Sequence, residues 1–517
     1  MPPYIRLFPV PHMHLRPYVL MAAALSAPLA PARGQTATCD GGTAAGYPCF
    51  NVDLMARVPL STFGAGASRI SEAWGWTDPA DDREYAIVGV VDGTVFVDVT
   101  QPTAPVYLGK LPSALPHPVN GRWRVFRTYG NHVFVGSEIN DHGIQVFDLT
   151  RLRSVTSPPV TFTVDAHYTG NGNTHTIWIN EATGYMYLAG ATEAGYACNA
   201  GGLHIVDVSS PLSPVLAGCF QDPGGPVYVH ETECVVYAGP DADYTGREIC
   251  VNYVASMVTF VDVTDKANPT VISRASYPLP GYTHQGTFTS DWRHLLVDDE
   301  LDETNGSFAT ARTIILDVQD LDDVEYVGAY MSPVAATDHN QYVVGRYVYQ
   351  ANDMAGLRIL DTQDVASGTL TEVAYFDTYP AANLPGFEGM WMAYPFFPSG
   401  NIVAGDREGG LFVLRPDQNV VASEPEATVA GHRLSSPTPN PATDRATARL
   451  TVDRAQHVRA ELFDALGRRV AVAYDGPVAA GVSIPISMEV GSLPPGIYVV
   501  RVHGETFAAS RSLSIVR

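Results

Sequence analysis

Lysine is nearly absent from this chain of 517 residues and occurs only at positions 110 and 266. Charged residues make up 16% of the sequence, and the net charge at pH 7 is −23. Proteins that bind nucleic acids without regard to sequence need basic patches that displace counterions from phosphates. No such patch occurs here, so we expect no nucleic-acid partner. The acidic balance is typical of an exported protein with a solvated surface.

Long apolar runs are also lacking, apart from one short stretch near the N-terminus. Arg6 and Arg16 precede the apolar run 19–25, and small residues such as Ala30 and Ala32 follow it. This run is too short to span a bilayer and is typical of a cleaved export signal. We expect residues 1–34 to be a signal peptide and the mature protein to have no transmembrane segment.

Familiar catalytic motifs are missing as well. The sequence has no Gly-x-Ser-x-Gly elbow, no Walker loop and no Cys-x-x-Cys pair. Its six cysteines fall into three close pairs, 39/49, 198/219 and 234/250, which predicts disulfides in an exported chain. Six cysteines can pair in many ways, and proximity is only a guide. The 234/250 pair spans an expected β-hairpin and is the pairing that the sequence supports best.

What the chain does contain is a short segment repeated seven times. Its fullest copy is GLHIVDVS at residues 202–209, and the same aspartate recurs at intervals of 44 to 59 residues; a seventh copy, at 410–415, has lost it. A period of about 40 to 50 residues, rich in β-branched and aromatic residues, is typical of propeller blades. We expect each aspartate to accept backbone N–H bonds where a third strand enters a turn. The six aspartates are Asp98, Asp148, Asp207, Asp262, Asp317 and Asp361.

The seventh unit lacks a fourth strand, because Leu414 is followed by a polar linker. Residues 53–59 align without gaps against residues 106–112, the fourth strand of the first unit. We therefore expect residues 51–60 to complete the last blade, which would cover two sheet edges and leave a monomer. The predicted fold is all-β: a seven-bladed β-propeller closed by an N-terminal strand, followed by a small C-terminal β-sandwich. The predicted domains are 35–64, with the closing strand; 65–416, the propeller; 417–438, a linker; and 439–517, the C-terminal domain.

Three motifs follow one another near the C-terminus. They are PNP at 439–441, FDALGR at 463–468 and LPPGIYVVR at 493–501. In this order they resemble the type A sorting domain of the type IX secretion system of Gram-negative bacteria. The resemblance implies that residues 439–517 interact with the type IX machinery. It also implies transport across the outer membrane, then release or attachment to the outer cell surface.

Further motifs lie within residues 65–416. They include GGLHIVD at 201–207, YTHQG at 282–286, DDELDE at 298–303 and DHN at 338–340. These stretches resemble the choice-of-anchor B family, whose blades carry LVIVD-type repeats. The resemblance implies a surface protein whose anchor varies between members. It implies no established reaction.

One position in the first strand of each unit carries a side chain that could bind a metal. It holds histidine in units three to six and glutamate in units one and seven, while Arg124 is the match in unit two. First strands line the channel of a propeller, so this position would form a ring around the axis. Imidazoles and carboxylates in such a ring suit Zn, Mn, Fe or Cu. The predicted metal ligands are Glu72, His175, His230, His284, His339 and Glu388.

Two other interpretations of these residues remain open. The ring could be structural, with its polar groups bonded to buried water and to neighbouring blades. Alternatively, acidic residues near the second strands could surround the same mouth and bind Ca²⁺ through oxygen ligands. These acidic residues are Glu138, Glu193, Asp298, Asp299, Glu300, Asp353 and Asp406.

Two functions follow from these observations. The variable anchor of the similar family and the missing catalytic motifs favour a secreted or surface-bound, non-enzymatic module that binds an extracellular protein or glycan. The alternative is a metal-dependent hydrolase or oxidoreductase that uses the ring of histidines and glutamates. A metal that is lost when the histidines are replaced would support the alternative.

Overall fold

The computed structural model of the protein describes residues 36–64, 66–116, 123–421, 432–434, 437, 442–452, 454–464, 468–482, 484–494, 496–504 and 507–515. The predicted signal peptide, residues 1–34, lies outside the described residues. The same is true of residues 422–431 of the predicted linker.

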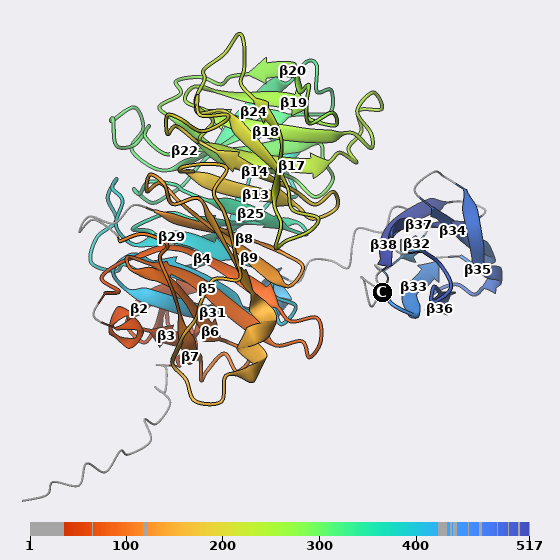
Figure 1. The fold of residues 1–517 in the computed structure, drawn as a ribbon, viewed down its shortest axis with the longest axis horizontal. Coiled ribbons are helices and arrows are strands. Elements are labelled where there is room, and N and C mark those ends of the chain that lie inside the picture. Colours follow the sequence, from red (N-terminus) through yellow and green to blue (C-terminus); the bar gives the residue numbers. More distant parts are fainter. Residues whose placement is uncertain are drawn as a thin grey trace, which may run out of the picture.

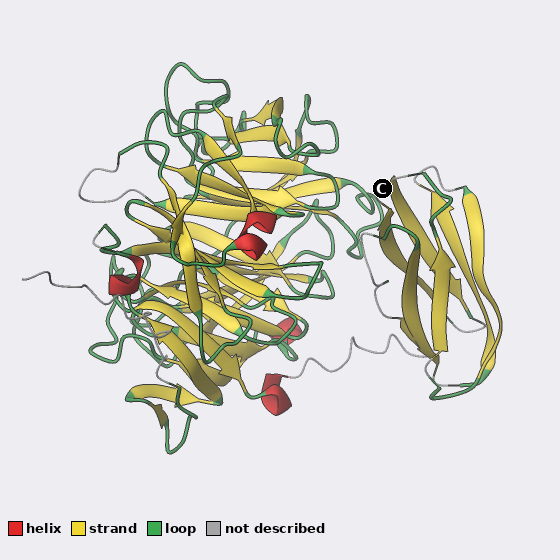
Figure 2. Ribbon diagram, turned by 60° about the horizontal axis from the view of Figure 1, so that its bottom comes forward, coloured by secondary structure: helices red, strands yellow, loops and turns green. Residues whose placement is uncertain are grey.

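The described chain is all-β and is built from repeated sheets, most of them with four strands, consistent with propeller-like repeats. Seven such sheets occur within the described residues up to 421. In Figure 1 their colours follow the order of the sequence, from red and orange through green to cyan. Helices are few and short, as Figure 2 shows. They are η1 (Leu60–Phe63), η2 (Leu149–Ser154), η3 (Val365–Ser367) and α1 (Gln418–Val421).

The first four sheets each take most of their strands from one stretch of the chain. The first sheet contains β4 (Ile70–Thr77), β5 (Glu84–Val90), β6 (Gly93–Asp98), β7 (Val106–Pro112) and β11 (Val160–Thr161). The second contains β8 (Arg124–Tyr129), β9 (His132–Ser137), β10 (Ile144–Asp148) and β12 (Ala166–Tyr168). The third contains β13 (Thr176–Asn180), β14 (Tyr185–Ala189), β15 (Leu203–Asp207) and β16 (Val215–Phe220), and the fourth contains β17 (Glu231–Val236), β18 (Glu248–Val254), β19 (Met257–Asp262) and β20 (Thr270–Ala275).

The remaining three sheets continue the pattern. The fifth contains β21 (Thr283–Phe288), β22 (His294–Asp299), β23 (Arg312–Asp317) and β24 (Glu325–Met331). The sixth contains β25 (Gln341–Val344), β26 (Tyr347–Ala351), β27 (Leu357–Asp361) and β28 (Thr371–Phe376), extended by β2 (Tyr47–Phe50) and β1 (Thr43–Ala44). The seventh contains β29 (Met390–Tyr394), β30 (Ile402–Asp406), β31 (Gly410–Pro416) and the N-terminal strand β3 (Val52–Val58).

The third sheet shows why these sequences form hairpins. Strands β13 and β14 are rich in β-branched and aromatic residues, which favour a pleated, half-buried surface. Between them, the side chain of Asn180 accepts a hydrogen bond from the backbone N–H of Ala182, and Gly184 adopts a φ of +71°. An asparagine that bonds to the backbone two residues later, followed by a glycine at positive φ, reverses the chain with little strain.

The repeated aspartates have the predicted structural role. In each copy, one carboxylate oxygen accepts a hydrogen bond from the backbone N–H two residues later, at 2.9 to 3.0 Å. The six donors are Thr100, Thr150, Ser209, Thr264, Gln319 and Gln363. The prediction that these aspartates stabilise turns is therefore confirmed.

The N-terminal strand β3 pairs with β31, as the alignment of residues 53–59 predicts. The pairing is antiparallel and runs from Val52 opposite Pro416 to Val58 opposite Leu411. The first strands of neighbouring sheets also contact one another in chain order, from β4 through β8, β13, β17, β21 and β25 to β29. Strand β29 in turn contacts β4.

Three disulfides form, and they are the pairs that proximity predicts. Cys39–Cys49 fixes the segment before β3, Cys198–Cys219 links the loop before β15 to β16, and Cys234–Cys250 joins β17 to β18. The last two cysteines lie directly opposite each other in the antiparallel pair, as expected for a hairpin. No cysteine in the described residues is left free.

Two further sheets lie in the described C-terminal residues and share one hydrophobic core. One contains β32 (His432–Leu434), β33 (Arg445–Val452) and β36 (Ile484–Glu489); the other contains β35 (Arg469–Val478), β34 (Gln456–Asp464), β37 (Gly496–His503) and β38 (Ala508–Ile515). Leu450 and Ile486 of the first sheet and Leu462 and Val500 of the second are buried in this core. Among the described residues, no helix is long and apolar enough to cross a membrane.

Candidate metal centre

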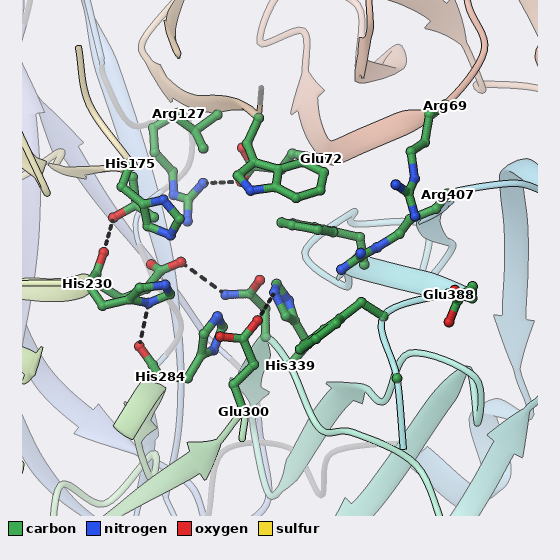
Figure 3. A pocket seen from close by; sticks show the side chains of 18 residues that line it. Arg69, Glu72, Arg127, His175, His230, His284, Glu300, His339, Glu388 and Arg407 are labelled. Carbon is green, nitrogen blue, oxygen red and sulfur yellow. Dashed lines mark hydrogen bonds and ion pairs between the residues drawn. The ribbon is translucent and has the colours of Figure 1, made fainter. Parts of the chain in front are cut away.

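A cavity of about 560 Å³ lies where the first strands begin. Each of the seven repeated sheets contributes to its lining, either from the first strand itself or from the residues just before it. The lining combines four histidines with carboxylates, arginines and aromatic rings. Figure 3 shows its principal side chains: Arg69, Glu72, Arg127, His175, His230, His284, Glu300, His339, Glu388 and Arg407.

Four imidazoles form a continuous row along one wall of the cavity. The ring centroids of neighbouring histidines lie 4.2 Å apart for His175 and His230, 4.6 Å for His230 and His284, and 4.3 Å for His284 and His339. His230, His284 and His339 are almost completely buried. The four predicted histidines thus lie side by side, His284 within β21 and the other three one or two residues before their first strands.

Three of these histidines are held by a hydrogen-bond partner at Nδ1. For His175 the partner is Glu138 at 2.7 Å, for His284 it is Asp298 at 2.8 Å, and for His230 it is the backbone carbonyl of His284 at 3.3 Å. When Nδ1 donates to such a partner, the lone pair is on Nε2, and this is how proteins orient histidines that bind metals. The arrangement therefore leaves Nε2 of each ring as the atom available for a metal.

Glu300 completes a set that could hold one metal ion. One ligand atom each from His230, His284 and Glu300 lies within 4.8 Å of the others. A carboxylate oxygen of Glu300 also lies 3.9 Å from Nε2 of His339. Ligand atoms around one tetrahedral Zn²⁺ lie about 3.4 Å apart, at bond lengths of about 2.1 Å. The three side chains would have to approach one another by up to roughly 1.4 Å to bind such an ion.

The protonation of the row differs from one histidine to the next. Burial, together with the neighbouring His175 and His284, lowers the pKa of His230 well below its usual value. Burial also lowers the pKa of His339, with further contributions from His284 and Arg407. Burial lowers the pKa of His284 too, but Glu300 and Asp298 outweigh it and raise this pKa to about 9. A bound cation would replace the proton of His284 and would meet a neutral His230.

The two predicted glutamate ligands line the cavity but are not part of this set. Glu72 accepts hydrogen bonds from the backbone N–H of Phe126 at 2.7 Å and from Nη1 of Arg127 at 2.6 Å. Burial raises the pKa of Glu72 to about 7, although Arg127 lowers it. Glu388 precedes β29, next to Gly389 at a φ of +92°, and Figure 3 shows it well apart from the histidines.

Most of the acidic residues considered for Ca²⁺ have separate partners, whereas neither carboxylate oxygen of the buried Asp353 has a hydrogen-bond partner among the described residues. Asp299 accepts hydrogen bonds from the backbone N–H groups of residues 281 and 282, and Glu193 accepts one from Asp141. Asp406 accepts two from the backbone of residues 408 and 409. Asp298 and Glu138 support histidines, so most of these carboxylates act through neighbouring groups instead of converging on one ion.

Several residues of the cavity were not apparent from the sequence. At the second sheet, Arg124 bonds to the carbonyl oxygens of Val90 and Val91, and Arg127 reaches the cavity in its place. An aromatic wall continues the row of imidazoles. The ring of Trp391 lies 4.6 Å from that of His339 and 4.1 Å from that of Trp123.

Comparison with known families identifies two parts of the chain. Residues 438–516 match the secretion system C-terminal sorting domain, and residues 171–222 match the LVIVD repeat. The chain carries a type IX sorting tail and an LVIVD repeat. The tail implies interaction with the secretion machinery and export to the cell surface or the medium. No curated protein matches the chain.

Two solved structures show a distant likeness. One is PorZ, an essential surface component of the type IX secretion system of Porphyromonas gingivalis. It has a TM-score of 0.45 and 11% identity over 89% of this chain and 61% of the PorZ chain. The other is a protein from Lactobacillus plantarum, with a TM-score of 0.42 and 13% identity over 82% of this chain and all of that one. This chain spans less than two thirds of PorZ, and these TM-scores carry no inference about function.

Proposed function

We propose that the protein is an exported propeller that binds a divalent transition metal in the cavity at the mouth of its channel. The seven repeated sheets, the chain-order contacts of their first strands, the contact of β29 with β4 and the pairing of β3 with β31 support a closed ring of seven blades. The sequence motifs within residues 65–416 support membership of the choice-of-anchor B family. Residues 439–517 then direct export, and the body stays on the outer surface or is released.

The observation that carries the metal site is the convergence of His230, His284 and Glu300. Their ligand atoms lie within 4.8 Å of one another, and both imidazoles have an Nδ1 partner that orients them. Two imidazoles and one carboxylate suit Zn²⁺, Fe²⁺ or Mn²⁺ better than Ca²⁺, which prefers oxygen ligands alone. A metal held in this way would fix a ligand in the cavity, such as part of an extracellular protein or glycan.

Metal analysis of the purified protein tests this function directly. The protein is prepared without a histidine tag, and metal content is measured by mass spectrometry beside a His230→Ala/His284→Ala double variant. His132→Ala is the matched control, because His132 lies on β9 and does not line the cavity. We expect about one equivalent of a transition metal in the wild type and the control, and none in the double variant. A folded wild type that binds no metal after incubation with Zn²⁺, Mn²⁺ and Fe²⁺ would contradict the proposal.

A second candidate function is metal-dependent hydrolysis. Three protein ligands leave a coordination position open, which is typical of catalytic metal sites, and the cavity is large enough for a small substrate. A metal in such a site polarises an oxygen of the substrate or activates water. The His175–Glu138 pair lies beside the set and could accept a proton. We expect metal-loaded protein to hydrolyse nitrophenyl esters or nitrophenyl phosphate. His175→Ala should reduce this turnover without loss of metal. Absence of turnover by the metal-loaded wild type would reject this candidate.

A further inference from the structure

The three arginines of the cavity differ in how their charge is balanced. Arg127 donates to Glu72 at 2.6 Å, and Arg69 donates to Glu408 at 3.1 Å at the exposed edge. Arg407 is balanced less closely. The carboxylate found within 4 Å of it, among the described residues, is that of Asp353, whose Oδ1 lies 3.5 Å from Nη2. Charge-assisted hydrogen bonds to carboxylates are shorter, about 2.7–2.9 Å.

Arg407 is also deeply buried, with only 2% of its surface exposed. In the part of the chain that the structure describes, its Nε and Nη2 atoms have no hydrogen-bond partner. Burying a guanidinium without satisfying its donors is costly, so native proteins rarely do so without a reason. A partner that is not part of the polypeptide would remove this cost.

The surroundings of Arg407 favour a small anionic partner. Its guanidinium carbon lies 3.8 Å from the ring centroid of Trp391 and 5.4 Å from that of Trp123. A guanidinium stacked on an aromatic ring keeps its edge free for a carboxylate or phosphate, whose two oxygens match its planar fork. Because Arg407 is almost completely buried, solvent screens its charge little, which strengthens the attraction between opposite charges.

The position of Arg407 relative to the histidines completes the argument. Trp391 contacts both groups, because its ring centroid lies 4.6 Å from that of His339 and 3.8 Å from the guanidinium carbon of Arg407. Figure 3 shows the guanidinium of Arg407 and the carboxylate of Glu300 within the same cavity. A molecule bound at Arg407 would therefore extend towards His230, His284 and Glu300. The volume of about 560 Å³ is in the range of sites for small organic molecules.

We propose that the cavity binds a small organic molecule through a carboxylate or phosphate group, that Arg407 holds this group, and that Trp123 and Trp391 flank it. The inference deepens the proposed function, on which it rests for the placement of the ligand beside a metal. Arg407 acts here as a binding residue. An arginine that only packs on Trp391 and pairs loosely with Asp353 would not distinguish charged from neutral ligands.

A pair of nearly isosteric probes tests the proposal. Benzoate and benzamide have the same size and an aromatic ring, but only benzoate carries a charge; phenyl phosphate represents the phosphate class. We expect calorimetry to show that wild-type protein binds at least one of the two anions about 10-fold or more tightly than benzamide, the effect of a hydrogen bond to a charged group. A preference for benzoate or for phenyl phosphate then identifies the anionic group.

The same titrations on variants assign the preference to Arg407. We expect Arg407→Gln to lose the preference for anions over benzamide and Arg407→Lys to retain part of this preference. Arg247→Gln is the matched control, because Arg247 is exposed and pairs with Asp262 away from the cavity lining. Equal binding of anions and benzamide by the wild type, or no binding of anions at millimolar concentration, would overturn the proposal. The wild-type comparison can overturn the proposal without any variant, and Arg407→Lys assigns the preference to Arg407 if Arg407→Gln does not fold.

Metal content is measured in each sample, so the two proposals can fail separately. The His230→Ala/His284→Ala variant should lose the metal but keep the anion preference that depends on Arg407. A metal-free wild type that still prefers anions would contradict the metal site and support the anion site. A metal-loaded wild type without this preference would support the metal site and contradict the anion site.

Discussion

The replacement Glu300→Gln separates metal binding from folding. The side chain of Glu300 is 17% exposed, and its carboxylate lies 3.9 Å from Nε2 of His339. Its loss should also destabilise the metal-free protein near pH 7, because Glu300 is a main cause of the raised pKa of His284. The effect of the metal is therefore the difference between unfolding with and without metal, measured for each protein. Residues that merely support metal ligands contribute about 10- to 100-fold to affinity, so loss of a direct ligand should cost at least about 100-fold.

This affinity loss has a measurable effect on stability. At a metal concentration of about 100 times the dissociation constant, binding stabilises the wild type by about 2.7 kcal/mol. After a 100-fold loss of affinity, the same concentration stabilises the variant by only about 0.4 kcal/mol. Denaturant unfolding with and without Zn²⁺ should therefore show a difference of about 2 kcal/mol between the two proteins, and calorimetry gives the affinity itself.

The matched control is Glu138→Gln, which changes the same functional group next to His175. Glu138 has a similar exposure, 22%, but lies outside the set of His230, His284 and Glu300. We expect this variant to bind the metal nearly as well as the wild type. If Glu300→Gln keeps wild-type affinity while Glu138→Gln loses it, the metal lies at the other end of the histidine row and our choice of ligands is wrong.

Three further predictions concern stability. Replacing Cys234 and Cys250 by serine should lower the free energy of unfolding by about 3 kcal/mol in urea titrations, because a loop of 16 residues is no longer closed. Asp207→Ala should cost about 1 kcal/mol in the same assay, because the turn loses the bonds that Ser209 donates. Burial raises the pKa of Glu233 to about 8, so the folded state retains a proton that the unfolded state releases near pH 4.5. Stability should therefore fall as the pH rises from 4.5 to 8, by on the order of 5 kcal/mol. Glu233→Gln should remove this dependence, and equal pH profiles would contradict the assignment.

The sequence predicts the repeated sheets well because each repeat carries its own local signals. The aspartate that stabilises each turn acts on the backbone two residues later, and the strands around it are rich in β-branched and aromatic residues. The pairing of β3 with β31 joins residues far apart in the chain, yet it is predictable, because the seventh unit lacks a strand and residues 53–59 match the missing one.

The cavity is less predictable because neighbouring sheets determine what each side chain can do. Glu72 occupies the expected position, but Arg127 from the next sheet binds its carboxylate. Glu388 lies two residues before β29, as His339 lies two residues before β25, but it is followed by Gly389 at a φ of +92°. Glu300 comes from the loop after β22, whose length the repeat does not fix. A repeat predicts where first strands lie, whereas loops and contacts between sheets decide which side chains reach the cavity.

The row of histidines illustrates how a repeat acquires a specific site. Four imidazoles occupy similar positions, but each has a different neighbour: Glu138 for His175, a carbonyl oxygen for His230, Asp298 for His284 and Glu300 for His339. A structural ring of equivalent residues would need no such differences. Asp298 is only 1% exposed, and its Oδ1 forms a hydrogen bond with Nδ1 of His284. This bond fixes the orientation of the His284 imidazole, which also faces Glu300. Burying a carboxylate costs free energy, so a buried Asp298 that orients His284 needs a reason. A role for His284 as a metal ligand explains it best.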